Sequence, residues 1–224
     1  MRALPLPGTN GEMALTTNGM KKMTKLECRM TKRAFTLIEP LVVIAIIAVL
    51  LGLAFPVFQG VLDRAKKVQA KNDLIQIVTA VNAFYLEYGK YPVPTTASGD
   101  GYASGSTTGT SSRAVLDPLR NLDTTLNPRQ IVFFIAPDAR DQTTPKSGIK
   151  AADGQFYDPW GTPYGITIDA DYDNQVPNPY TAGGGAGGSE IRQGVIAWSV
   201  GKDKKLGNNG DNKFTGSGDV ISWQ

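Results

Sequence analysis

The feature that most constrains this chain is an apolar run from Pro40 to Leu62 that contains no formally charged residue. The run has 23 residues, most of them Val, Ile, Leu or Ala, and a helix needs about 20 to cross the hydrocarbon of a bilayer. The apolar core of a secretory signal peptide is shorter, at roughly 7–15 residues. We therefore expect a membrane-spanning helix in this part of the chain.

The distribution of charge gives that helix an orientation. Residues 1–34 carry seven Lys and Arg against two Glu, whereas the rest of the chain carries 16 basic and 18 acidic residues. Basic residues beside an apolar span stay on the cytoplasmic side, so the C-terminal part would lie on the opposite side of the membrane. That part shows no basic patch suited to nucleic acid, and we expect no nucleic-acid partner.

Glu39 directly precedes the apolar run, and a plain membrane anchor does not explain it. A lone ionisable group near the centre of a bilayer costs about 3 kcal/mol on insertion scales. Such a group therefore needs a charged partner or a position at the edge of the membrane.

The residues around this carboxylate, KRAFTLIEPLVVIAIIAVL, resemble the N-terminal signature of type IV pilins and type II secretion pseudopilins. The resemblance implies that a prepilin peptidase cleaves the chain between Ala34 and Phe35 and that Phe35 is then N-methylated. It also implies that Glu39 serves assembly, by pairing with the new amine of a neighbouring subunit in a filament.

The attraction between the amine and the carboxylate can be compared with the free-energy cost of burying Glu39. An amine and a carboxylate about 4 Å apart attract by roughly 4 kcal/mol at an effective dielectric constant near 20. Since this nearly equals the burial cost of Glu39, the pair would select the register between helices, and apolar contacts would hold them together.

Two residues depart from the family pattern. Ala34 stands where the family prefers Gly, but it is still small, so we expect cleavage. Pro40 replaces the usual Leu, and proline is tolerated at the first position of a helix. We therefore expect the regular helix to begin at Pro40.

These observations divide the chain into four segments. Residues 1–34 form a cytoplasmic leader that is cleaved, and residues 35–62 form the transmembrane and filament-core helix. Residues 63–92 continue this helix with one apolar face, and residues 93–224 form a periplasmic globular head with flexible loops.

The apolar face of residues 63–92 has helical spacing, which predicts packing against the head. Its members are Leu74, Ile77, Val78, Val81, Phe84, Tyr85 and Tyr88. Gly89 suits the end of the helix, and Pro92 prevents it from resuming. The predicted fold class is α+β, with a long N-terminal hydrophobic helix packed on a small antiparallel sheet, as the resemblance to pilins implies.

Weaker patterns follow in the head. Residues 95–112 are rich in Gly, Ser and Thr, which predicts an exposed or disordered loop. Residues 126–138 are predicted as a short helix, because Asn127 can act as its N-cap and Gln130 occupies the capping-box position. Strands are predicted at residues 164–169, 192–201 and 218–223.

The stretch YDPWGTPYGI, residues 157–166, resembles a turn of the major pseudopilins of type II secretion. Pro159 and Gly161 would set a tight turn, while Trp160 and Tyr164 would cover the edge of the sheet. We interpret these aromatic residues as a hydrophobic staple rather than a binding platform.

The C-terminal loop has the composition of a cation site. Asp203, Asp211 and Asp219 alternate with Gly and Asn, and Ca²⁺ prefers six to eight oxygen ligands in flexible geometry. The resemblance implies a calcium loop with Asp203, Asp219 and the carbonyl of Val200 as ligands. Because this loop is longer than usual, Asp211 would replace or supplement them. The alternative, a solvated loop without metal, remains open.

A second acidic stretch, residues 169–174, mimics the start of an EF-hand loop. Asn174 and Tyr180 stand where that loop requires Gly and Glu. We therefore expect a polar turn there.

Catalysis is not expected. The chain has no His, and its one Cys, Cys28, lies in the leader, so Ser/His and Cys/His arrangements are excluded. We interpret the chain as a structural subunit of a type II secretion pseudopilus or type IV pilus-like filament. Its partners would be the prepilin peptidase, its own copies, other pilin-like subunits and the inner membrane. The alternatives are a membrane-anchored periplasmic binding or adhesion module and a surface pilin.

Overall fold

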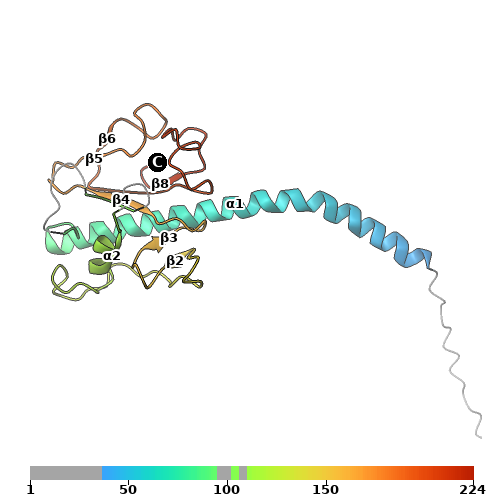
Figure 1. Cartoon of the computed structure of the whole chain (residues 1–224), viewed down its shortest axis with the longest axis horizontal. Helices are drawn as coiled ribbons and strands as arrows, with labels where there is room; N and C mark the ends of the chain where they lie inside the picture. The colour runs from blue at the N-terminus through green and yellow to red at the C-terminus, as the bar shows by residue number, and fades with distance from the viewer. Residues whose placement is uncertain (1–36, 95–101, 106–109) are drawn as a thin grey trace, which may run out of the picture. The chain divides into compact units, whose positions relative to one another are not determined.

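The structure is a computed structural model that describes residues 37–94, 102–105 and 110–224 (Figure 1). Its contacts divide the chain into two compact units, Met1–Val49 and Leu50–Gln224. The long helix α1 (Ile38–Tyr88) contributes to both. The fold is α+β, because the second unit combines helix with small antiparallel sheets.

The start of α1 differs from expectation. The helix begins at Ile38, two residues before Pro40. The first four N–H groups of a helix have no acceptor within it, so a proline at the third position removes no hydrogen bond. Among the residues that the structure describes, no helix combines the length and hydropathy required to cross a membrane.

The second half of α1 carries the predicted apolar face. Leu74, Ile77, Val81 and Phe84 are fully buried, which confirms the helical spacing. The helix ends where Gly89 donates its N–H to the carbonyl of Tyr85 at 2.8 Å and turns into the left-handed region, with φ 66°.

A four-stranded antiparallel sheet has the order β1-β4-β7-β8. The predicted strands at 164–169, 192–201 and 218–223 are confirmed as β4 (Gly165–Ile168), β7 (Val195–Ser199) and β8 (Val220–Ile221). Beyond them, the edge strand β1 (Tyr102–Ser104) pairs with β4 inside the segment expected to be a loop. The loop prediction is therefore wrong for these three residues.

Both faces of the sheet are buried. Along β7, Val195 and Ala197 belong to the apolar core that includes α1, whereas Ile196 and Trp198 belong to a second core on the other face. Successive strand residues point to opposite faces, so all five residues of β7 are buried. Figure 1 shows α1 running along one face of this sheet, with the C-terminal loops on the other side.

Shorter elements complete the second unit. These are α2 (Arg113–Leu119), the hairpin of β2 (Gly148–Ile149) and β3 (Phe156–Tyr157), and the pair of β5 (Val176–Pro177) and β6 (Glu190–Ile191).

The helix predicted at residues 126–138 is wrong, because the structure has no helix there. Asn127 is fully buried and bonds both the N–H and the carbonyl of Ile131, at 3.1 and 2.7 Å. Its side chain thus offers the backbone an alternative to helical hydrogen bonds. Gln130, the expected capping-box residue, has φ 57°, which interrupts a helix.

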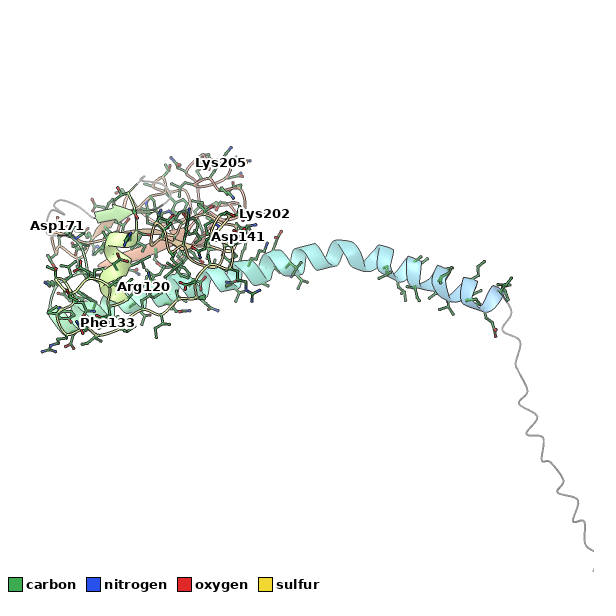
Figure 2. All side chains as sticks on the ribbon, turned by 60° about the horizontal axis from the view of Figure 1, so that its bottom comes forward. Arg120, Phe133, Asp141, Asp171, Lys202 and Lys205 are labelled. Atoms are coloured by element: carbon green, nitrogen blue, oxygen red, sulfur yellow. The ribbon has the colours of Figure 1, made fainter. Side chains whose placement is uncertain are left out.

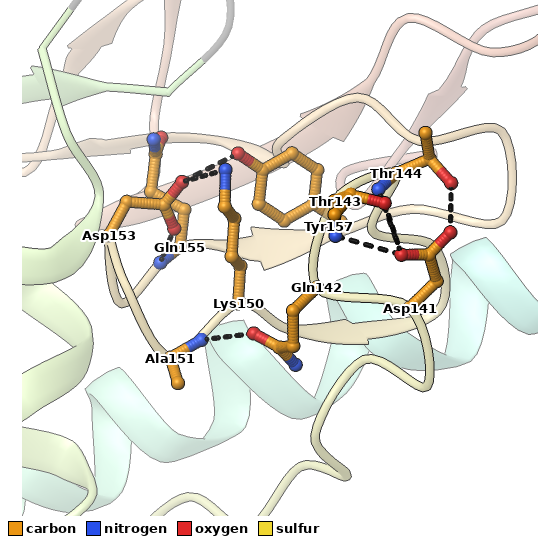
Figure 3. A network of polar contacts seen from close by, with 9 residues as sticks. All are labelled: Asp141, Gln142, Thr143, Thr144, Lys150, Ala151, Asp153, Gln155 and Tyr157. Carbon is orange, nitrogen blue, oxygen red and sulfur yellow. Dashed lines mark hydrogen bonds and ion pairs between the residues drawn. The ribbon is translucent and has the colours of Figure 1, made fainter.

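Polar contacts hold the loop that leads into the β2–β3 hairpin (Figure 3). Asp141 accepts hydrogen bonds from the backbone N–H and the hydroxyl of Thr143, at 2.8 and 2.6 Å, and from Thr144. These bonds, led by those from the two threonine hydroxyls, lower the pKa of Asp141 well below its ordinary range. Asp153 accepts the hydroxyl of Tyr157 at 2.8 Å. Every contact in this network is internal to the loop and hairpin, and we assign it a structural role.

Candidate functional site

The N-terminal assembly site is described only from Leu37 onward. Ala34 and Phe35, the predicted cleavage and methylation residues, lie outside the described residues. Glu39 is exposed in the first turn of α1, where a carboxylate is favoured by the partial positive charge of a helix N-terminus.

The helix that follows Glu39 in the first unit is apolar on all sides. A helix of this kind is stable only when it is buried in other apolar material. Its exposed large side chains are Leu41, Val42, Val43, Ile44, Ile46, Ile47 and Val49.

Asp219 is the best-placed residue of the predicted calcium loop. It is 6% exposed, and its Oδ2 accepts the hydroxyl of Tyr180 at 2.9 Å and the N–H of Gly207 at 2.8 Å. Its Oδ1 is also buried but has no hydrogen-bond partner among the described residues. Burial, helped by the negative charge of Asp203, raises the pKa of Asp219 to about 6.

The other predicted ligands are less well placed than Asp219 to hold a cation. Asp203 is exposed and accepts the N–H groups of Lys205 and Asn209 at 3.2 and 3.3 Å. Asp211 is exposed, and its Oδ1 accepts two N–H groups of its own loop. Val200 lies in the second core. Within the described part of the chain, these carboxylates do not form a cluster of three.

Such a cluster occurs instead at the other acidic stretch. Ligand atoms of Asp169, Asp171 and Asp173 lie within 4.8 Å of one another. Asp169 is 2% exposed and accepts the N–H groups of Tyr172 and Asn174 at 2.6 and 2.8 Å, as in the predicted polar turn. Burial raises the pKa of Asp169.

The prediction of metal ligands did not include this cluster. The alternation Asp-x-Asp-x-Asp in residues 169–173 was interpreted as a polar turn, because Asn174 and Tyr180 do not fit an EF-hand loop.

The DPWG turn forms a buried polar centre. Asp158 is fully buried and accepts the N–H groups of Trp160 and Thr162, each at 2.9 Å. Its second oxygen accepts the hydroxyl of Ser199 on β7 at 2.6 Å. Burial raises the pKa of Asp158. With Trp160 and Tyr164 both buried in the first core, this turn fastens the hairpin to the sheet.

The comparisons with known proteins each cover at most 30% of the chain. The family described as the prokaryotic N-terminal methylation motif matches residues 29–55. Type II secretion system core protein G of Klebsiella michiganensis is 34% identical over 64 residues, which are 29% of this chain and 45% of that protein.

Two pilins match over similar lengths. Type IV major pilin protein PilA of Myxococcus xanthus is 41% identical over 59 residues, 26% of this chain and 27% of the pilin. Type IV major pilin protein PilE1 of Neisseria gonorrhoeae is 37% identical over 68 residues, 30% of this chain and 41% of the pilin. The chain thus spans less than half the length of these relatives, and no solved structure matches it.

Proposed function

We propose that this chain, whose N-terminal segment resembles those of type IV pilins and type II secretion pseudopilins, is a structural subunit of a pseudopilus or pilus-like filament. The observation that carries the proposal is the methylation motif at residues 29–55, which contains Ala34, Phe35 and Glu39 in one continuous segment. The relatives are pilins and a secretion-system core protein, which favours a role without catalysis.

In the proposed mechanism, a prepilin peptidase cuts after Ala34 and exposes the amine of Phe35. Glu39 is exposed in the first turn of α1, and in the proposed filament it faces a neighbouring subunit. Its carboxylate attracts the amine of that subunit by roughly 4 kcal/mol at an effective dielectric constant near 20. Because burial of the carboxylate costs nearly as much, the ion pair selects the register between subunits.

In this mechanism, packing between the apolar helices of neighbouring subunits holds the filament together. The exposed Val, Ile and Leu side chains between Leu41 and Val49 face all sides of α1. Between neighbouring helices in a membrane or filament core, van der Waals packing drives association. The inner membrane holds the subunit before assembly, and the head lies in the periplasm or at the cell surface.

We also propose that the C-terminal loop binds Ca²⁺. The buried Oδ1 of Asp219, which lacks a hydrogen-bond partner among the described residues, fits a hard cation. Asp203, whose negative charge acts on Asp219, and the carbonyl of Val200 would supply further oxygen donors. Asp211 already accepts hydrogen bonds from two backbone N–H groups and is a supplementary ligand. When bound, the ion would neutralise the charge of these carboxylates and so hold the two ends of the loop together.

The filament function is tested with the Glu39→Ala variant in cells that contain the assembly machinery. Filaments should be lost, because the amine of Phe35 then has no partner, while the exposed Glu87→Ala control on the same helix should assemble normally. Mass spectrometry should find N-methyl-Phe35 as the first residue in both variants. An uncleaved leader, or normal filaments from Glu39→Ala, would contradict the proposal.

A further inference from the structure

The second unit carries an acidic surface at one end. The acidic pole consists of Asp169, Asp171 and Asp173, together with Glu190. The three aspartates approach within 4.8 Å of one another, and Asp171, Asp173 and Glu190 are exposed. Asp173 and Glu190 line the same hollow beside the β5–β6 pair. The pole therefore presents several negative charges on a small area.

A basic surface occurs in the same unit. The basic pole consists of residues 63–71 on α1 and the loop 201–213, which together contain eight Lys and Arg and three Asp. The ion pair between Lys202 and Asp63, at 2.8 Å, joins the two segments. Lys66, Lys67 and Lys205 are exposed, and no ion pair in the described part of the chain includes them.

The two poles lie at opposite ends of the globular part of this unit. Figure 2 shows Asp171 at one end of the head, with Lys202 and Lys205 toward the other. Tyr172, which lies between Asp171 and Asp173 in the sequence, packs against Tyr85 near the end of α1, with ring centroids 6.4 Å apart. Lys202 instead contacts Asp63, which lies 22 residues earlier on the helix and therefore roughly 33 Å away along it.

We propose that the acidic pole of one copy docks on the basic pole of the next copy. This inference rests on the proposed filament function and names the head-to-tail contact that filament would use. Two different complementary surfaces on opposite ends of a unit make a heterologous contact, which propagates into an open helical assembly rather than a closed dimer. The opposite charges steer the heads together and exclude copies that approach with like poles.

A cysteine pair tests the contact in assembled full-length protein. Asp171→Cys and Lys205→Cys are introduced together in a Cys28→Ser background, which removes the only native cysteine. A disulfide needs Cα atoms within about 7 Å, so these two positions cannot join within one copy. Oxidation of filaments should give a ladder of covalent multimers. Asp171→Cys paired with Leu122→Cys, an exposed position after α2, should give none.

Charge reversal provides a second measurement. Asp171→Lys with Asp173→Lys, or Lys204→Asp with Lys205→Asp, should each reduce the amount of filament at least about tenfold, because like poles then face each other. The four substitutions combined should restore filaments. Normal filaments from both reversed variants, or filaments without a ladder from the cysteine pair, would overturn the docking inference alone. Absence of any filament from the unmodified chain would remove the filament function and the inference with it.

Discussion

The hydroxyl of Tyr164 donates a 2.7 Å hydrogen bond to Asp73 on α1, which joins the residue before β4 to the long helix across 91 positions of sequence. Tyr164 is fully buried, and burial raises the pKa of its hydroxyl, with the negative charge of Asp73 adding to the effect. Burial likewise raises the pKa of Asp73, while the bond from Tyr164 opposes that change. This contact and the 2.7 Å hydrogen bond from Lys71 to the carbonyl of Ile221 on β8 are polar parts of the interface between helix and sheet.

Removing that hydroxyl should destabilise the second unit. Tyr164→Phe leaves the half-buried Asp73 without this donor, and losing one partner of such a bond costs about 1–3 kcal/mol. Urea unfolding followed by Trp fluorescence should show the loss. Tyr157→Phe is a matched control, because Asp153 keeps its 3.7 Å ion pair with Lys150 and should lose less. Equal stability of the Tyr164→Phe variant and the unmodified chain would contradict this role.

Asn127 should contribute more to the free energy of unfolding than an exposed asparagine does. It receives the hydroxyl of Tyr88 at 2.5 Å and bonds the carbonyl of Pro118 at 2.9 Å, in addition to its two bonds with Ile131. Asn127→Ala should lower the free energy of unfolding by roughly 2–4 kcal/mol, since buried backbone groups lose their partners.

The exposed Asn82→Ala on α1 is the control for this variant. It should be neutral or slightly stabilising, because alanine has the higher helix propensity. Similar losses of unfolding free energy in Asn127→Ala and Asn82→Ala would show that the hydrogen bonds of Asn127 do not stabilise the fold.

Stability should depend on pH through Asp219. Its pKa is raised from 3.8 to about 6 by burial, so between these values the folded chain holds a proton that the unfolded chain has released. The free energy of unfolding therefore falls as pH rises through this window, by up to roughly 3 kcal/mol. Asp219→Asn should flatten the decline in unfolding titrations without calcium, whereas the exposed Asp211→Asn should keep it.

Calcium should oppose this destabilisation at neutral pH. A ligand that binds only the folded state adds about 2.7 kcal/mol at 100 times its Kd, so chelation should lower the Tm of the calcium-loaded chain. Asp219→Asn should abolish the response. If Asp171→Asn abolishes it instead, the ion binds at the acidic pole. An unchanged Tm on chelation would rule out a structural calcium ion at either place.

The sequence by itself determined the features that depend on near neighbours. The run from Pro40 to Leu62, the carboxylate of Glu39, the apolar spacing from Leu74 to Tyr88 and the end of α1 at Gly89 are all set within a few turns of helix. The strands β4, β7 and β8 were likewise visible as short β-branched segments. Hydropathy and backbone preference act locally, and they therefore leave a pattern in the sequence.

Only the tertiary structure decided where distant polar groups meet. Asn127 looked like a helix cap, but Tyr88 and the carbonyl of Pro118 give it partners that a local pattern cannot reveal. Residues 102–104 form a strand because β4 offers its edge, although their own composition favours a loop. A buried hydrogen-bonding group must find a partner wherever the fold supplies one, and that requirement overrides weak local preference in the head.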